Sequence, residues 1–183
     1  MKLQISFIAF SMLVFIASCK KDEDEVTNPP IVNEEEVITT LTLQFTETSG
    51  AEDPFTVTFR DPDGDGGLAP DIFESITLTG GLSYTCSILL LNETETPADT
   101  ISLEVLAEAD EHLFCFEVTG ADLDIARTDS DGEFEVGLES LWTAGALSSG
   151  TVMVTLKHQP GIKDGTCEVG DTDVEVEFDV VIE

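Results

Sequence analysis

The alternation of apolar and polar side chains is the sequence feature that most limits how this chain can fold. It runs from residue 37 almost to the end of the 183 residues. It is clearest in the last segment, where apolar residues take every second position: Val174, Val176, Phe178, Val180 and Ile182. A period of two puts successive side chains on opposite faces of a β-strand, so that one face is buried and the other is wet.

Similar runs recur along the chain and predict an all-β fold. They lie near residues 41–45, 55–59, 76–78, 82–91, 112–118, 123–126, 134–142, 152–156 and 174–182. Clusters of Gly, Pro, Asn and Asp separate them, as at 61–67 and 160–165. Short alternating strands joined by turns favour an antiparallel two-sheet β-sandwich, Ig-like in architecture, over residues 37–183.

One segment, residues 99–110, fits two kinds of structure. Ile101, Leu103 and Val105 have the spacing of a strand. The segment also begins with Thr100 and is rich in Leu, Glu and Ala, which favour helices. We expect a short helix that crosses one end of the sandwich, with a strand as the alternative.

The first 18 residues have the pattern of a lipoprotein signal peptide. Lys2 precedes an apolar run, and the small residues Ala17 and Ser18 stand directly before Cys19. This arrangement resembles the lipobox of bacterial lipoproteins, which implies that Cys19 becomes the first mature residue and carries lipid. Several acyl chains give stable anchoring, so we expect Cys19 to insert into membrane lipid.

Residues 19–36 predict an acidic flexible tether. They contain few apolar residues and include Pro29 and Pro30. Lys20 and Lys21, followed by four acidic residues, resemble the surface-export signal of Bacteroidota lipoproteins. The resemblance implies a lipid-anchored protein that faces outward from the outer membrane.

The charge of the chain excludes one class of partner and favours another. Seven Lys and Arg stand against 38 Asp and Glu, for a formal charge of −31. A nucleic-acid-binding protein needs a basic surface, so nucleic acid is excluded as a partner. The 42% of hydrophobic residues can form a core, which excludes a disordered acidic chain. The negative charge favours cations, and hard divalent cations in particular.

The two histidines of the chain predict a transition-metal site. His112 and His158 are in phase with core-facing residues, one at the start of an expected strand and one at the end of another. If those strands are adjacent and antiparallel, both imidazoles reach the same end of the sandwich, close to Asp110 and Glu111. Two imidazoles and a carboxylate suit zinc, copper or iron. The alternative is a pair of structural histidines hydrogen-bonded to loop carbonyls.

The loop 61–67 predicts a calcium site. Asp61, Asp63 and Asp65 stand at alternate positions and Gly66 follows, as in acidic loops that wrap an oxygen-seeking ion. An EF-hand would have Glu at the twelfth position, where this chain has Ile72, so an EF-hand is excluded. The alternative is a polar turn between strands.

The cysteines and the catalytic motifs give weaker indications. Besides Cys19 there are Cys86, Cys115 and Cys167, which allow one disulfide at most. Cys86 and Cys115 lie in strand-like runs and could pair across a sheet, or could be buried as small apolar residues. No nucleophile elbow, zinc-protease motif or phosphate-binding loop occurs, so we do not expect an enzyme.

Six stretches together carry a resemblance to a known family: 33–41, 61–67, 91–94, 108–112, 156–160 and 171–178. They resemble a family of small, uncharacterised Bacteroidota surface lipoproteins, often labelled "type 1 periplasmic binding fold superfamily protein". The likeness covers nearly the whole mature chain and implies lipid anchoring. It implies no established activity, and the strand pattern favours a sandwich over the two-lobed α/β fold that the label names.

These observations lead to two hypotheses on function. The first is an outer-membrane-anchored binding module for a metal ion or small ligand, accessory to a TonB-dependent transporter. The second is a structural or adhesion β-domain in which calcium stiffens the 61–67 loop.

Overall fold

A computed structural model describes residues 36–64 and 67–183 and confirms an all-β sandwich with one short helix. The predicted signal peptide, the lipidation residue Cys19, and Asp65 lie outside the described residues, as does the predicted tether except for Glu36. Within the described ranges, no helix is long and apolar enough to cross a membrane.

Six strands form the larger sheet, in the order β3-β2-β1-β5-β8-β7. All neighbours in this sheet are antiparallel. The strands are β1 (Thr40–Glu47), β2 (Phe55–Arg60), β3 (Ile72–Phe73), β5 (Ser83–Leu91), β7 (Leu123–Arg127) and β8 (Glu139–Ala144).

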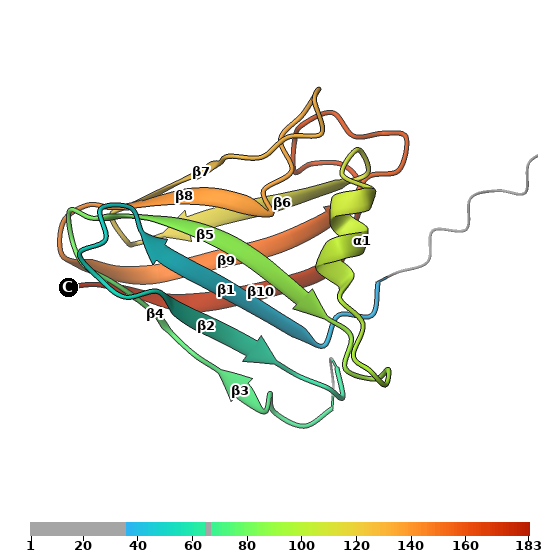
Figure 1. The fold of residues 1–183 in the computed structure, drawn as a ribbon, viewed down its shortest axis with the longest axis horizontal. Helices are drawn as coiled ribbons and strands as arrows, with labels where there is room; N and C mark the ends of the chain where they lie inside the picture. Colours follow the sequence, from blue (N-terminus) through green and yellow to red (C-terminus); the bar gives the residue numbers. More distant parts are fainter. Residues whose placement is uncertain (1–35, 65–66) are drawn as a thin grey trace, which may run out of the picture. The chain divides into compact units, whose positions relative to one another are not determined.

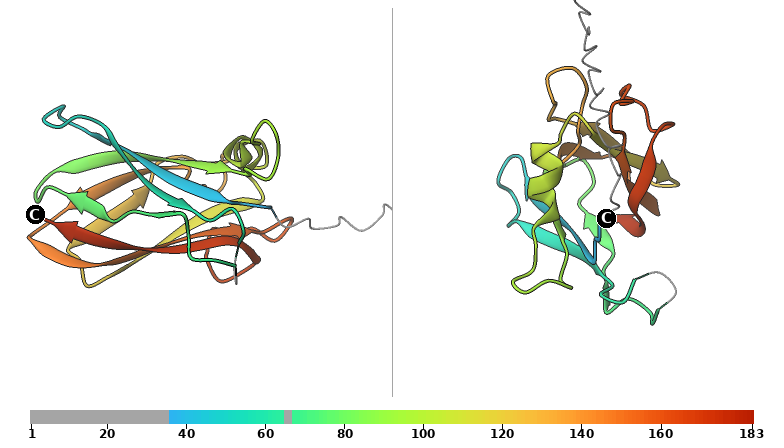
Figure 2. Two further views of the ribbon diagram at one scale, coloured as in Figure 1. Left: turned by 90° about the horizontal axis from the view of Figure 1, so that it is seen from below. Right: turned by 90° about the vertical axis from the view of Figure 1, so that its right-hand side faces the viewer.

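Four strands form the second sheet, in the order β4-β10-β9-β6. They are β4 (Ile76–Leu78), β6 (His112–Thr119), β9 (Ser148–His158) and β10 (Asp171–Ile182). β4 pairs parallel with β10, whereas the other pairs are antiparallel. This pair is the one departure from the antiparallel expectation, and it follows the point where the chain changes sheets, between β3 and β4. The two sheets form the layers visible in Figures 1 and 2.

The core lies between the sheets and follows the predicted alternation. The inward residues of β1 and β10 are almost fully buried: Leu41, Leu43, Phe45, Val176, Phe178, Val180 and Ile182. Aromatic rings fill the centre, where Phe45 and Trp142 meet edge to face with ring centroids 5.1 Å apart. Trp142 donates its ring N–H to Ser140 Oγ at 2.9 Å, so this buried polar group has a partner.

The expected helix is α1 (Ile101–Ala107), which lies across one end of the sandwich (Figure 1). Ile101 and Val105, one turn apart, are buried, so the apolar residues of this segment follow the spacing of a helix and not that of a strand. Thr100 is the N-cap residue but its side chain makes no capping hydrogen bond. The helix ends at Ala107 with Glu108 as its C-cap residue, and the chain then turns into β6 at the end opposite the C-terminus.

The predicted pairing of Cys86 with Cys115 is wrong, because Cys115 forms a disulfide with Cys167. Cys86 points from β5 into the core and stays a free, buried thiol, whose pKa is raised by burial. Cys115 lies on the outer face of the other sheet, since its neighbours Phe114 and Phe116 face the core. The bridge therefore attaches the loop between β9 and β10 to the edge strand β6.

Candidate functional site

The two histidines lie side by side, because their strands meet the condition set in the sequence analysis. β6 and β9 are antiparallel neighbours, and their register pairs His112 directly with His158. The rings stack with centroids 4.6 Å apart and planes within 4°. His112 is fully buried and His158 is 8% exposed. Both imidazoles thus occupy the end of the sandwich that α1 crosses.

The hydrogen bonding of His112 determines which of its ring nitrogens can bind a ligand. Nδ1 lies 3.1 Å from the backbone carbonyl of Glu108, which can only accept, so Nδ1 carries the proton and donates it. Burial lowers the pKa of His112 and favours the neutral ring. In that ring Nε2 has a free lone pair, and it finds no hydrogen-bond partner among the described residues. A metal-binding histidine is commonly oriented in this way by a carbonyl that accepts from its other nitrogen.

His158 is less constrained than its neighbour. Within the described part of the chain, neither of its ring nitrogens has a hydrogen-bond partner, although both are buried. Its Nε2 lies 3.6 Å from Glu111 Oε2, beyond a normal hydrogen bond. Buried polar atoms are rarely left without partners in folded proteins, so the two ring nitrogens of His158 are unusual.

A third ligand candidate, Asp173, was missed by sequence reasoning. The pairing of β10 with β9 shifts between Thr172 and Val174, so Asp173 is the extra residue of a β-bulge. Strict alternation would place this side chain on the wet face, but it is fully buried, with Oδ2 3.8 Å from His112 Nε2. No sequence signal marks a bulge at this position.

The start of β10 depends on the glycine before it. Gly170 has a φ of +83°, and a Cβ there would lie 2.3 Å from the carbonyl oxygen of His158. Only glycine allows this close approach in the left-handed region. The chain can then pair Asp171 with His158 and bring Asp173 to the histidines.

His112, His158 and Asp173 form a compact set of potential metal ligands. One donor atom from each lies within 4.8 Å of the other two. Bonds of about 2.0–2.1 Å in a tetrahedral zinc site put donor atoms about 3.3 Å apart. Because the two rings are parallel, binding one ion would require them to tilt and draw together slightly. The three side chains are donors of the kind that a borderline transition-metal ion takes.

A second ligand set shares His112 with the first. Glu36 and Glu108 each place a carboxylate oxygen within 4.8 Å of each other and of a ring nitrogen of His112. Glu108 is also the residue whose carbonyl orients His112. Burial raises the pKa of Glu36, and the neighbouring Glu104, Asp173 and Glu108 raise it further.

The carboxylates predicted beside His112 are only partly brought to the histidines. Glu111 approaches His158, as given above. Asp110 belongs to neither ligand set of the described residues and instead lines a separate hollow with Asp131 and Lys163. The prediction of a nearby carboxylate thus identified one contact, and the bulge at Asp173 supplies the closer one to His112.

In the predicted calcium loop, one of the expected ligands already accepts a hydrogen bond from the backbone of the loop. Asp63 Oδ2 accepts from the N–H of Leu68 at 2.7 Å, which lowers the pKa of Asp63. Asp61 is buried beside it, and burial raises its pKa. One oxygen of Asp61, Oδ1, has no hydrogen-bond partner among the described residues. The third expected ligand, Asp65, lies outside those residues.

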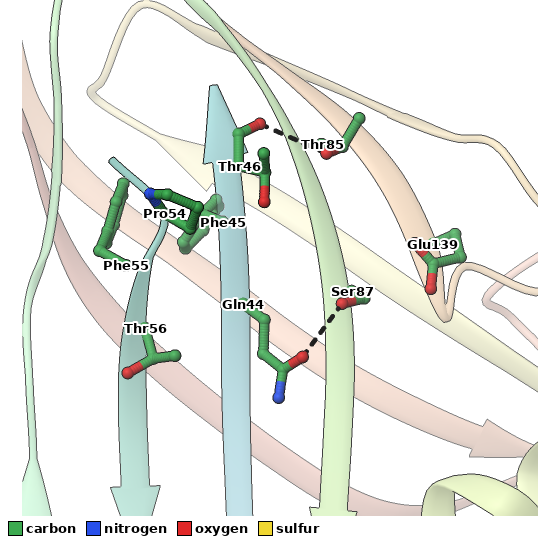
Figure 3. A pocket seen from close by; sticks show the side chains of 9 residues that line it. All are labelled: Gln44, Phe45, Thr46, Pro54, Phe55, Thr56, Thr85, Ser87 and Glu139. Carbon is green, nitrogen blue, oxygen red and sulfur yellow. Dashed lines mark hydrogen bonds between the residues drawn. The ribbon is translucent and has the colours of Figure 1, made fainter. Parts of the chain in front are cut away.

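An acidic cleft of about 600 Å³ adjoins the histidine site. Its lining includes the carboxylates of Glu36, Asp61, Asp173 and Glu175 together with the apolar Ile38 and Phe59. A smaller hollow of about 290 Å³ lies on the outer face of the larger sheet (Figure 3). There Ser87 donates to Gln44 across β1 and β5, and Glu139 is the one carboxylate of its described lining. Both sets of potential metal ligands among the described residues thus contain His112, at the histidine end.

Comparison of the chain with family models, with curated proteins and with solved structures finds no match.

Proposed function

We propose that this chain is a binding module that holds a transition-metal ion, with His112, His158 and Asp173 as ligands. The observation that carries the proposal is the juxtaposition of two buried imidazoles and a buried carboxylate within 4.8 Å. Neutral imidazole and carboxylate together suit Zn²⁺, Cu²⁺ or iron.

The electrostatics of the site support a cation there. The lone pair of neutral His112 lies opposite the Asp173 carboxylate at 3.8 Å, an arrangement of two electron-rich groups. A metal ion between them would turn this contact into an attraction. Burial disfavours a proton on His112, which keeps the lone pair of Nε2 available to such an ion.

The sequence supports a location for this module. The lipobox-like residues before Cys19 and the acidic stretch after it favour a lipid anchor in the outer membrane, with the sandwich at the cell surface. A metal-binding lipoprotein in that position would suit an accessory role beside a TonB-dependent transporter. We propose binding rather than catalysis, since the chain carries none of the catalytic motifs considered above.

Titration calorimetry with Zn²⁺ on the metal-free protein tests the proposal. We expect one ion per chain, and affinity lowered at least about 100-fold by Asp173→Asn or His158→Ala, the upper end of the loss caused by removing a partner of a ligand. Asp179→Asn is the matched control, because Asp179 is an exposed carboxylate of the same strand. Absence of Zn²⁺, Cu²⁺ and Fe²⁺ binding to the unmodified chain would overturn the proposal.

Calcium in the 61–67 loop is the second candidate, favoured by the buried Oδ1 of Asp61, which lacks a hydrogen-bond partner among the described residues. In this alternative the protein is a structural or adhesion domain with a stiffened connection. Millimolar Ca²⁺ would raise the melting temperature, and Asp63→Ala would abolish the rise. An unchanged melting temperature in the unmodified protein would exclude the loop as a calcium site.

A further inference from the structure

Glu36 is held near the histidines although it precedes the first strand. The backbone bonding of the larger sheet begins at Thr39 in the described chain, where Thr39 N–H donates to Leu91 O at 2.9 Å and its carbonyl accepts from Asp61 N–H at 2.8 Å. Glu36 lies three residues before this point and is half-buried. Its carboxylate nevertheless reaches the ligand set of His112 and Glu108.

The surroundings of Glu36 connect the two ligand sets. The pKa of its carboxylate is raised by burial and by the charges of Glu104, Asp173 and Glu108, and it is lowered by His158. Glu36 and Asp173 also line the same cleft. The Glu36 carboxylate thus stands close to members of both sets, in a part-buried place where negative charges repel one another.

We infer that Glu36 supplies a fourth ligand to the ion held by His112, His158 and Asp173, so that metal binding fastens residues 36–38 to the end of the sandwich. The inference rests on the proposed function. Two imidazoles and two carboxylates complete a four-coordinate site for an ion such as Zn²⁺. A divalent ion would also neutralise the repulsion between Glu36 and Asp173.

Fastening these residues has a consequence for the whole chain. Glu36 is the last residue of the predicted tether, and β1 begins at Thr40. An ion bound by Glu36 would restrict the chain at the junction between tether and domain.

Two measurements on the full mature chain test the inference. In the first, Zn²⁺ titration of Glu36→Gln should show affinity at least about tenfold weaker than that of the unmodified chain. The matched control is Glu104→Gln, which removes a charge that acts on Glu36 but belongs to neither ligand set. In the second, hydrogen exchange at the amides of Val37 and Ile38 should slow when Zn²⁺ is added to the unmodified chain and stay fast in Glu36→Gln.

The outcomes separate this inference from the proposed function. If the unmodified chain binds no Zn²⁺, the metal site itself fails. If it binds Zn²⁺ but Glu36→Gln binds equally well, Glu36 is not a ligand. If Glu104→Gln weakens binding as much as Glu36→Gln, the effect is one of general charge and the inference is overturned. If Glu108→Gln weakens binding while Glu36→Gln does not, Glu108 is the fourth ligand and residues 36–38 are not fastened.

Discussion

Two buried groups of ionisable side chains lie at the same end of the sandwich and differ in one respect. Lys163 and Asp131 form an ion pair at 2.7 Å, with their side chains only 3% and 7% exposed. Lys163 also donates to the carbonyl of Ala109, just after α1, at 2.7 Å. His112 and His158 are equally buried, but three of their four ring nitrogens have no hydrogen-bond partner among the described residues.

The difference separates a structural pair from the proposed binding site. Both oxygens of Asp131 accept hydrogen bonds, because Asp131 also accepts from the backbone N–H groups of Glu133 and Phe134. Such a pair positions the loops that carry it. The histidines have lone pairs available at a place where burial makes them costly unless something binds. Burial combined with missing partners is therefore the reason why we propose the histidines, and not the ion pair, as the binding site.

Removing the lysine of the ion pair should give the largest loss of stability. Lys163→Met should lower the free energy of unfolding by about 3–5 kcal/mol, because it leaves the Asp131 charge buried without its counter-ion. Zn²⁺ affinity should stay within about threefold, since the histidines do not use the pair. Urea unfolding and Zn²⁺ titration check these two values. Lys157→Met, at a half-buried lysine that donates to Thr172, is the control for loss of charge. A collapse of Zn²⁺ affinity in Lys163→Met would show that the two regions are one unit.

Removing the disulfide should have the next largest effect and should reach both regions. Cys115 and Cys167 are 52 residues apart, and closing a loop of that length stabilises by about 4 kcal/mol in the chain-entropy treatment. The double variant Cys115→Ala with Cys167→Ala should therefore lose about 2–4 kcal/mol of unfolding free energy. Because the bridged loop leads into the start of β10, which carries Asp173, Zn²⁺ affinity should fall as well. Equal affinity in the double variant would mean that the start of β10 is positioned without the bridge.

Local periodicity predicts much of this molecule, and long-range geometry supplies the rest. Alternation in segments such as β10 predicted the sandwich, and the phase of the two histidines predicted a shared end on the condition that their strands are adjacent and antiparallel, which they are. The bulge at Asp173 was not predictable, since it depends on how β10 meets β9 rather than on the residues of β10 alone. The predicted partner of Cys115 was wrong for a related reason. Cys86 points into the core and Cys115 points outward, and the strand pattern does not distinguish these two orientations.

The parallel pairing of β4 with β10 also lay beyond local sequence. Ile76 and Leu78 have the alternation of an inward-facing strand, which is confirmed by their burial. The sequence of β4 does not indicate which sheet the strand joins, and the chain changes sheets just before it. Glu36 illustrates the same limit, since its place in the acidic stretch predicts a solvated tether and only the fold brings it to His112.

A substitution in the histidine pair should reverse the pattern expected for Lys163. His158→Leu should leave the metal-free unfolding free energy within about 1 kcal/mol, because it removes polar atoms that lack partners and keeps an apolar side chain in their place. It should abolish stabilisation by Zn²⁺, which at 100 times the dissociation constant amounts to about 2.7 kcal/mol in the unmodified chain. Thermal melting with and without Zn²⁺ measures both. A loss above about 3 kcal/mol without metal would assign His158 a structural role, as in the alternative considered from the sequence.

The smallest expected effect is the pH dependence of stability. The two regions should change the free energy of unfolding in different pH ranges. Burial lowers the pKa of His112 below 6.5, so the unfolded chain binds a proton more readily, and metal-free stability should fall as the pH drops through 6.5. Lys163 lowers the pKa of Asp131 from 3.8 to about 2, so the contribution of that carboxylate is present above pH 3.8 and is lost as the pH falls toward 2.

Urea unfolding across both ranges should show the upper step disappear in His112→Leu and the lower step shrink in Lys163→Met. Zn²⁺ should deepen the upper step in the unmodified chain, because protons compete with the metal for the imidazoles. An upper step that persists unchanged in His112→Leu would mean that another group titrates there and that His112 is not held neutral by burial.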